Sequence, residues 1–380
     1  MGTALARCCT AALGMALLAA CNSSSGQVAS HSASLSRTGS TASPSPTVAR
    51  ASAYGVLTDW RPGSGTYNIY LVTPEGAVAA HALAISPEVL TCGPTNSTPY
   101  MPAPVSTSGS LAYFMEARGS VRSLSPDGTV SDVLFTVAIG TTATLPASVP
   151  PRWSFFSVSP DGTEVAAATV EYDSRGMATT RLFVDHLIPH ANEQVGTSST
   201  LRFQETDSTT LWPVGWHSGR LILAKVPACP GAVGPAYWAS ELHVVDPATA
   251  VRKVTIGGPD CVIAGPPTQG GVLCETRAID FIVEGWDGSR QVQEPSGLTA
   301  QGPAYLSPNG KLIAVPDATS TRIPYQSIKP LSMSACGWID DSHLLGSAGT
   351  APAQIGNLSD GTVTTLTVAG TCVGRIPGGL

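Results

Sequence analysis

Short apolar stretches separated by turn residues recur along most of the chain. Three of the turns share one pattern, Ser-Pro-Asp-Gly or Ser-Pro-Asn-Gly between two apolar segments, at Ser123–Val130, Ser157–Val165 and Tyr305–Ile313. Proline presets φ for the first turn position, and Asp or Asn followed by Gly tolerates the positive φ that a tight turn requires. Each copy therefore predicts a β-hairpin, and a hairpin repeated this often predicts a β-propeller.

Two kinds of hairpin alternate along the sequence, as expected for four-stranded antiparallel blades that run from an inner strand a to an outer strand d. We expect turns between strands a and b at 106–110, 159–163, 216–220, 268–271, 307–311 and 339–342. Their spacing averages roughly the 40–50 residues of one blade. It predicts an all-β fold of seven blades, with six or eight as alternatives. The interval between Ser307 and Ile339 is shorter, so that blade should have short outer strands.

The first repeat lacks an inner strand and opens on a segment at 53–57 that has the pattern of strand b. The segment Thr371–Ile376 has no partner in its own repeat, and its Cys372-Val373 matches Cys261-Val262 at the start of another inner strand. We therefore expect Thr371–Ile376 to complete the first blade. This closes the ring and removes exposed sheet edges.

The N-terminal residues predict a targeting segment. Met1–Arg7 carries one positive charge, and the apolar stretch that follows is too short for a stable membrane span. It ends in Leu18-Ala19-Ala20-Cys21, which resembles a bacterial lipobox. We expect residues 1–20 to be a lipoprotein signal peptide and the Cys21 thiol to receive the lipid. The alternative is an ordinary secretory signal with an incidental cysteine.

The predicted lipid sets the expected location and domain order. Residues 21–50 are rich in Ser, Thr and Pro without an apolar period, which predicts a disordered tether. Residues 51–380 then form the propeller. The acyl chains on Cys21 should hold it on the outer face of the bacterial cell membrane.

Composition and charge narrow the range of partners. The formal net charge is -6, charged residues make up 12% of the chain, and no basic block occurs. Nucleic acid is therefore excluded as the main partner, because phosphate binding needs clustered Lys and Arg. A hydrophobic content of 43% supplies a large core.

Six cysteines lie in the predicted propeller. An even number in an exported domain predicts up to three disulfides, rather than buried free thiols, and leaves the pairing open. No pair has Cys-x-x-Cys spacing and no His lies near one, so neither a metal nor another cofactor is expected. The candidate disulfide cysteines are Cys92, Cys229, Cys261, Cys274, Cys336 and Cys372.

The hairpin repeats resemble a known family. Ser-Val-Ser-Pro-Asp-Gly-Thr-Glu-Val-Ala and Tyr-Leu-Ser-Pro-Asn-Gly-Lys-Leu-Ile-Ala are similar to repeats of TolB-like and WD40-like propellers. The lipobox and the Ala/Thr/Gly-rich usage resemble actinobacterial surface lipoproteins. The resemblance covers short stretches of three or four blades and implies protein binding on a rigid disc, although hydrolase-linked relatives exist. Nothing here matches Gly-x-Ser-x-Gly, since Gly215–Gly219 places its Ser one position late.

The loops after strands b and d share one face of a propeller, around the mouth of its channel. An arginine follows strand b in several repeats, and a ring of guanidinium groups would attract carboxylate or phosphate groups. Aromatic residues in the same loops would add flat apolar contact. The alternative is that both types serve solubility and local packing. The candidate binding face consists of Trp60, Arg61, Arg118, Tyr172, Arg175, Tyr237, Trp238, Arg277 and Arg322.

These patterns predict a monomeric binding or scaffold module rather than an enzyme. Its expected partner is an envelope protein, a glycan or another ligand. The alternative is a propeller hydrolase or lyase that acts on an extracellular glycan or ester. For that reaction Asp207, Asp260 and Glu275 near inner strands are the acid–base candidates. Asp residues at turns and strand ends more often accept backbone N–H groups. His186 and His190 have a spacing that suits a metal on a helix, but a proline lies between them.

Overall fold

The structure is a computed structural model that describes residues 52–90, 101–140, 151–173, 175–187, 194–195, 200–229, 239–276, 280–292, 303–324, 326–347 and 350–380. Residues Arg50–Leu380 form one compact unit. The predicted signal peptide, Cys21 and the tether lie outside the described residues. Within the described ranges no helix has the length and apolar character needed to cross a membrane.

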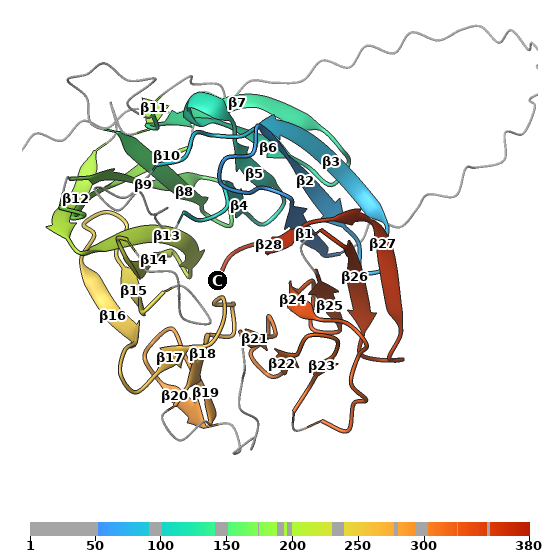
Figure 1. The fold of residues 1–380 in the computed structure, drawn as a ribbon. Helices are drawn as coiled ribbons and strands as arrows, with labels where there is room; N and C mark the ends of the chain where they lie inside the picture. Colours follow the sequence, from blue (N-terminus) through green and yellow to red (C-terminus); the bar gives the residue numbers. More distant parts are fainter. Residues whose placement is uncertain are drawn as a thin grey trace, which may run out of the picture. The chain divides into compact units, whose positions relative to one another are not determined.

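Residues from Tyr54 onward form a seven-bladed β-propeller (Figure 1). Blade 1 joins the two ends of the unit, with β28 (Thr371–Ile376) innermost, then β1 (Tyr54–Thr58), β2 (Thr66–Val72) and β3 (Val78–Ile85). Blade 2 contains β4 (Val105–Thr107), β5 (Ala112–Met115), β6 (Ser120–Leu124) and β7 (Val130–Val137). Blade 3 contains β8 (Arg152–Val158), β9 (Glu164–Tyr172), β10 (Ala178–His186) and β12 (Leu201–Asp207).

The remaining blades follow in sequence order around the ring. Blade 4 contains β13 (Thr209–His217), β14 (Arg220–Pro227), β15 (Glu241–Val245) and β16 (Arg252–Gly257). Blade 5 contains β17 (Val262–Ile263), β18 (Val272–Glu275), β19 (Phe281–Glu284) and β20 (Arg290–Val292). Blade 7 contains β24 (Ala335–Trp338), β25 (His343–Gly346), β26 (Pro352–Asn357) and β27 (Val363–Ala369).

Two blades depart from the regular pattern. Blade 6 has three described strands, β21 (Tyr305–Leu306), β22 (Ile313–Pro316) and β23 (Thr321–Arg322), and a single bridge from Thr321 to Leu331 takes the outer position. The prediction of short outer strands there is confirmed. The link between β10 and β12 contains β11 (Gln194–Val195), which pairs in parallel with β7 of blade 2.

The repeated Ser of the hairpin pattern explains why the turn recurs. In the turn after β8, Ser159 Oγ accepts hydrogen bonds from the backbone N–H groups of Thr163 and Glu164 at 3.1 and 2.9 Å. Ser307 Oγ makes the equivalent bonds to Lys311 and Leu312 at 3.2 and 2.9 Å. Both serines are buried, and each hydroxyl pairs two backbone donors within its own turn.

The segment Thr371–Ile376 completes the first blade and closes the ring, as predicted from the sequence. β28 pairs antiparallel with β1, from Tyr54 opposite Ile376 to Thr58 opposite Thr371. A disulfide between Cys336 on β24 and Cys372 on β28 also joins the inner strands of blades 7 and 1. The first blade is therefore held to the last by a sheet ladder and by a covalent bond.

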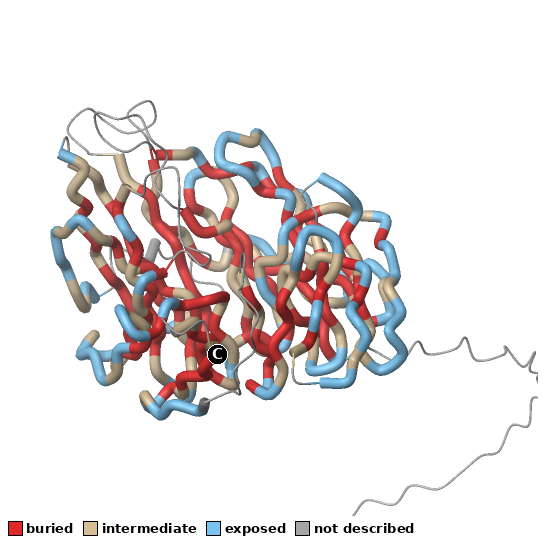
Figure 2. The backbone as a smooth tube through the Cα atoms, turned by 60° about the horizontal axis from the view of Figure 1, so that its bottom comes forward, coloured by how far each residue is buried: buried red, intermediate tan, exposed pale blue. Residues whose placement is uncertain are grey.

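The core lies between the blades. Buried positions follow the strands and exposed positions gather at the turns (Figure 2). Two tryptophans tie neighbouring inner strands together, because Trp216 Nε1 donates to the Ser157 carbonyl at 3.3 Å and Trp338 Nε1 donates to the Tyr305 carbonyl at 3.0 Å. Both rings therefore pack between neighbouring blades.

The residues after β28 cross the ring on the side of the a–b turns, and the end of the chain lies near the centre (Figure 1). The Gly378 N–H donates to the Ser108 carbonyl of blade 2 at 2.6 Å. The Leu380 N–H donates to the Trp216 carbonyl of blade 4 at 2.8 Å, and His217 Nδ1 donates to the Leu380 carbonyl at 2.6 Å. The last residues thus span from blade 1 to blade 4.

Candidate functional site: the central cavity

A central cavity of about 540 Å³ is enclosed by inner-strand segments of six blades and, in blade 5, by Pro266–Thr268 after β17. This volume is in the range of ordinary small-ligand sites. Gly378, Gly379 and Leu380 line it on the side of the a–b turns, where the last residues cross the ring. Trp60 and Pro102 line it from the b–c loop of blade 1 and from the segment that leads into β4. The protein's own chain therefore covers one end of the channel.

The cavity wall is mainly apolar. Its described lining contains no Asp, Glu or His side chain, and its polar side chains are mostly hydroxyl groups such as those of Thr58, Ser106 and Thr268. Aromatic and proline side chains give it a rigid apolar surface. The prolines are Pro102, Pro213, Pro266, Pro267 and Pro308, and the aromatic residues are Trp60, Phe155, Tyr305 and Trp338. Phe156 and Trp216 lie behind them, fully buried.

Among the described lining residues, only Arg375 has a charged side chain. It lies on β28 opposite Gly55, one position from the end of the strand that meets the crossing segment. One of its terminal nitrogens is buried and has no hydrogen-bond partner among the described residues. Burial lowers the pKa of Arg375, and the charges of Asp341 and Asp340 oppose that shift. A cation without a close counter-ion is therefore held in an apolar wall.

Trp60 is the member of the predicted binding face that reaches the cavity. Its side chain is buried, Nε1 donates to Ser86 Oγ at 3.1 Å, and its ring centroid lies 6.4 Å from that of Trp153. The indole N–H is thereby satisfied while the apolar ring contributes to the wall.

The described arginines of the predicted face are exposed, but Arg322 lies on strand c of blade 6 and not in the b–c loop where it was expected. Arg61 and Arg118 lie in b–c loops, and Arg322 is the last residue of β23. Arg175 pairs with Asp173 of its own turn at 3.0 Å. Tyr172 ends β9, and burial raises its pKa. Tyr237, Trp238 and Arg277 lie outside the described residues, so the grouping of these side chains into one binding surface stays a prediction.

The acid–base candidates do not line the cavity. Asp207 ends the outer strand β12, where Thr209 Oγ1 and the Ser208 N–H donate to it at 2.8 and 2.6 Å. These hydrogen bonds lower its pKa. Glu275 ends β18, where burial raises its pKa, and Asp260 precedes β17. None of the three belongs to the described lining.

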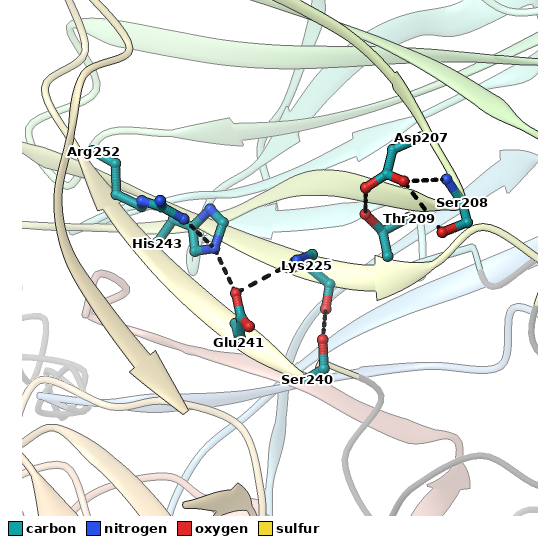
Figure 3. Close-up of polar contacts among 8 residues, drawn as sticks. All are labelled: Asp207, Ser208, Thr209, Lys225, Ser240, Glu241, His243 and Arg252. Carbon is teal, nitrogen blue, oxygen red and sulfur yellow. Dashed lines mark hydrogen bonds and ion pairs between the residues drawn. The ribbon is translucent and has the colours of Figure 1, made fainter. Parts of the chain in front are cut away.

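A polar cluster lies on blade 4, away from the cavity wall (Figure 3). Glu241 Oε2 accepts from His243 Nε2 at 3.0 Å and lies 3.7 Å from Lys225 Nζ. Burial is the main cause that lowers the pKa of His243, so the ring is neutral at pH 7. Arg252 NH1 is 3.4 Å from the same ring nitrogen. This network gives the buried His243 side chain polar partners on its own and a neighbouring strand, and none of its residues lines the central cavity.

The cysteines are used for disulfides. Cys261 and Cys274 join β18 to the residue before β17, Cys336 and Cys372 close the ring, and Cys229 is also disulfide-bonded. Cys92 lies outside the described residues. Glu284 Oε2 lies 3.8 Å from Cys274 Sγ, but both sulfurs of that bridge are bonded to each other, so this group offers no thiolate to a metal.

Comparisons with known proteins found only distant similarity to solved structures. No family model matches the sequence, and no protein with a curated description matches it. Saccharomyces cerevisiae Sqt1 is 12% identical, with 85% of this chain and 88% of that chain covered and a TM-score of 0.38. The C-terminal WD40 domain of Sif2 is 13% identical, with coverage of 68% and 70% and a TM-score of 0.34. An oligogalacturonate lyase in complex with manganese is 10% identical, with coverage of 84% and 78% and a TM-score of 0.32.

These similarities are too low to carry an argument about function. The seven blades themselves confirm the expected propeller. The lipoprotein part of the predicted resemblance stays a prediction.

Sequence reasoning missed Arg375 and the crossing segment. The sequence did contain a signal for Arg375, because this residue lies inside Thr371–Ile376, the segment expected as an inner strand. A charged residue on the strand nearest the channel of a propeller is a reason to consider a binding role. No pattern in the residues after Ile376 predicted where they would run.

Proposed function

We propose that the chain is a membrane-anchored, extracytoplasmic binding module whose ligand occupies the central cavity. The observation that carries this proposal is the cavity of about 540 Å³, with aromatic walls and one end covered by the chain itself. A concave apolar site with few polar groups is typical of small-molecule binding. An envelope protein or a glycan remains the proposed partner of the outer loop face, where Arg61 and Arg118 are exposed.

Binding is favoured over catalysis by the chemistry of the wall. Hydrolysis or elimination on a glycan or ester requires a positioned proton donor and acceptor close to the reacting atoms. The described lining offers neither a carboxyl nor an imidazole side chain. The hydroxyls of Ser106 and Thr268 have no base beside them in that lining.

The membrane anchor is supported by the sequence before the propeller and by the disulfides within it, since such bonds persist in oxidising compartments. In a bacterium that processes lipoproteins, Cys21→Ser should move the protein from the membrane pellet to the soluble extracytoplasmic fraction. Cys8→Ser, which changes a thiol in the predicted signal peptide, should stay with the membrane. Retention of the Cys21→Ser protein in the pellet after a salt wash would contradict the anchor.

Ligand binding in the cavity can be tested with the neutral probe N-phenyl-1-naphthylamine, which fluoresces when it leaves water. We expect the propeller to bind it, and Ala103→Trp, at a residue of the lining, to weaken binding by about tenfold, which corresponds to about 1.4 kcal/mol. Ala77→Trp, in an exposed turn outside the lining, is the matched control and should bind normally. Equal probe affinity in both variants would show that the probe binds elsewhere.

A further inference from the structure

We propose that the cavity binds an amphiphile with one anionic headgroup, which pairs with Arg375 while its apolar body packs against the aromatic wall. This inference rests on the proposed function, because it names the ligand class of the same cavity. It follows from the charge of the lining, from the position of Arg375 and from the state of the nearest carboxylates.

The charge of the wall favours a monoanion. Arg375 is the charged side chain of the described lining, and it forms no ion pair among the described residues. Arg375 is partly exposed, but its buried terminal nitrogen has lost water without gaining a partner, which is unfavourable. An incoming anion removes that cost through charge-assisted hydrogen bonds. A second negative charge on the ligand would find no cation in the described wall, so a single anionic group fits best.

The nearest carboxylates are engaged elsewhere. Asp340 accepts from the backbone N–H of Ser342 at 2.7 Å and from His343 Nδ1 at 2.9 Å. Asp341 accepts from the Asn309 N–H at 2.9 Å. Both carboxylates act on Arg375 only at longer range, so the guanidinium keeps donors for a ligand.

The position of Arg375 sets the orientation of the ligand. Arg375 is near the end of β28, beside the crossing segment, whereas Trp60 lies on the b–c loop of blade 1. Thr58, at the opposite end of the same β1–β28 ladder, also lines the cavity. The headgroup should therefore lie at the covered end and the apolar body should extend toward Trp60. A short alkyl carboxylate has this combination of features.

The test compares decanoate with decanol, which has the same chain length and no charge, by displacement of N-phenyl-1-naphthylamine. We expect the unmodified protein to bind decanoate about tenfold more tightly than decanol, as is typical for a hydrogen bond to a charged group. Arg375→Met should abolish this preference and leave decanol and probe binding unchanged. Arg375→Lys should keep part of the preference. Lys253→Met, which removes an exposed cation outside both the lining and the predicted binding face, should behave as the unmodified protein.

The outcomes separate this inference from the proposed function. Absence of probe binding by the unmodified protein overturns the proposed function itself. If the unmodified protein binds the probe but has equal affinity for decanoate and decanol, only the role of Arg375 is overturned. A preference for decanoate that survives in Arg375→Met overturns that role as well. Probe binding by Arg375→Met also reports that this variant is folded. If it does not fold, a reduced preference for decanoate in Arg375→Lys, together with normal probe binding, still decides for Arg375, whereas an unchanged preference in Arg375→Lys decides against it.

Discussion

Deletion of Thr371–Leu380 should abolish cooperative folding of the propeller, whereas deletion of Gly378–Leu380 should leave it folded. The larger deletion removes β28, exposes the inner edge of β1 and leaves Cys336 without its disulfide partner. Ladder hydrogen bonds contribute roughly 1 kcal/mol each and the disulfide roughly 4 kcal/mol. Their sum approaches the total stability of ordinary domains, which is about 5–15 kcal/mol.

The measurement is limited proteolysis combined with thermal unfolding followed by circular dichroism. The shorter deletion is the matched control, because it removes the crossing segment with its bonds to Ser108, Trp216 and His217 but keeps the whole β1–β28 ladder. A protease-resistant core and a single melting transition in the larger deletion would show that β28 is dispensable. The β1–β28 ladder and the disulfide would then contribute little to the free energy of folding.

The hairpins and the closing strand were predictable because local chemistry determines them. Ser159 and Ser307 pair backbone donors within their own turns, and Gly162 and Gly310 adopt φ of 73° and 76°, so a few adjacent residues specify each hairpin. The inner strand at Thr371–Ile376 was predictable for another reason. Four strands per blade left one segment without a partner, and closure of the ring gave it a place.

The cavity was not predictable in the same way, because it is made by residues that are distant in sequence. Trp60, Phe155 and Arg375 come from blades 1 and 3 and meet only after seven inner strands have been placed around one axis. The path of Gly378–Leu380 depends on carbonyl groups of blades 2 and 4, which no sequence pattern marks as acceptors. Trp60 was selected from the sequence as a loop residue, and its burial depends on the approach of Trp153.

The exposed arginines illustrate a further limit of sequence patterns. Arg61, Arg118 and Arg175 do follow strand b in their blades, so the predicted register holds at these positions. Their side chains point from loops, and Arg175 already has Asp173 as a local partner. A recurring position in a repeat thus predicts where a residue lies, but the direction and the partners of its side chain depend on the conformation of each loop.

Replacement of both cysteines of the ring-closing disulfide, Cys336→Ala with Cys372→Ala, should lower the free energy of unfolding by about 4 kcal/mol. The two residues are 36 positions apart, and the loop-entropy relation assigns about that value to a loop of this length. The matched variant Cys261→Ala with Cys274→Ala opens a loop of 13 residues and should lose about 3 kcal/mol. Guanidinium titration of both variants under non-reducing conditions gives these losses.

The location of the weakened region separates the two variants more sharply than the size of the loss. Cys336–Cys372 holds β24 to β28 across the seam between blades 7 and 1, whereas Cys261–Cys274 lies within blade 5. Hydrogen exchange at the amides of β1 and β28 should therefore accelerate only in the first variant, because local opening there no longer requires global unfolding. Equal protection of these amides in the two variants would mean that the β1–β28 ladder alone holds the ring closed.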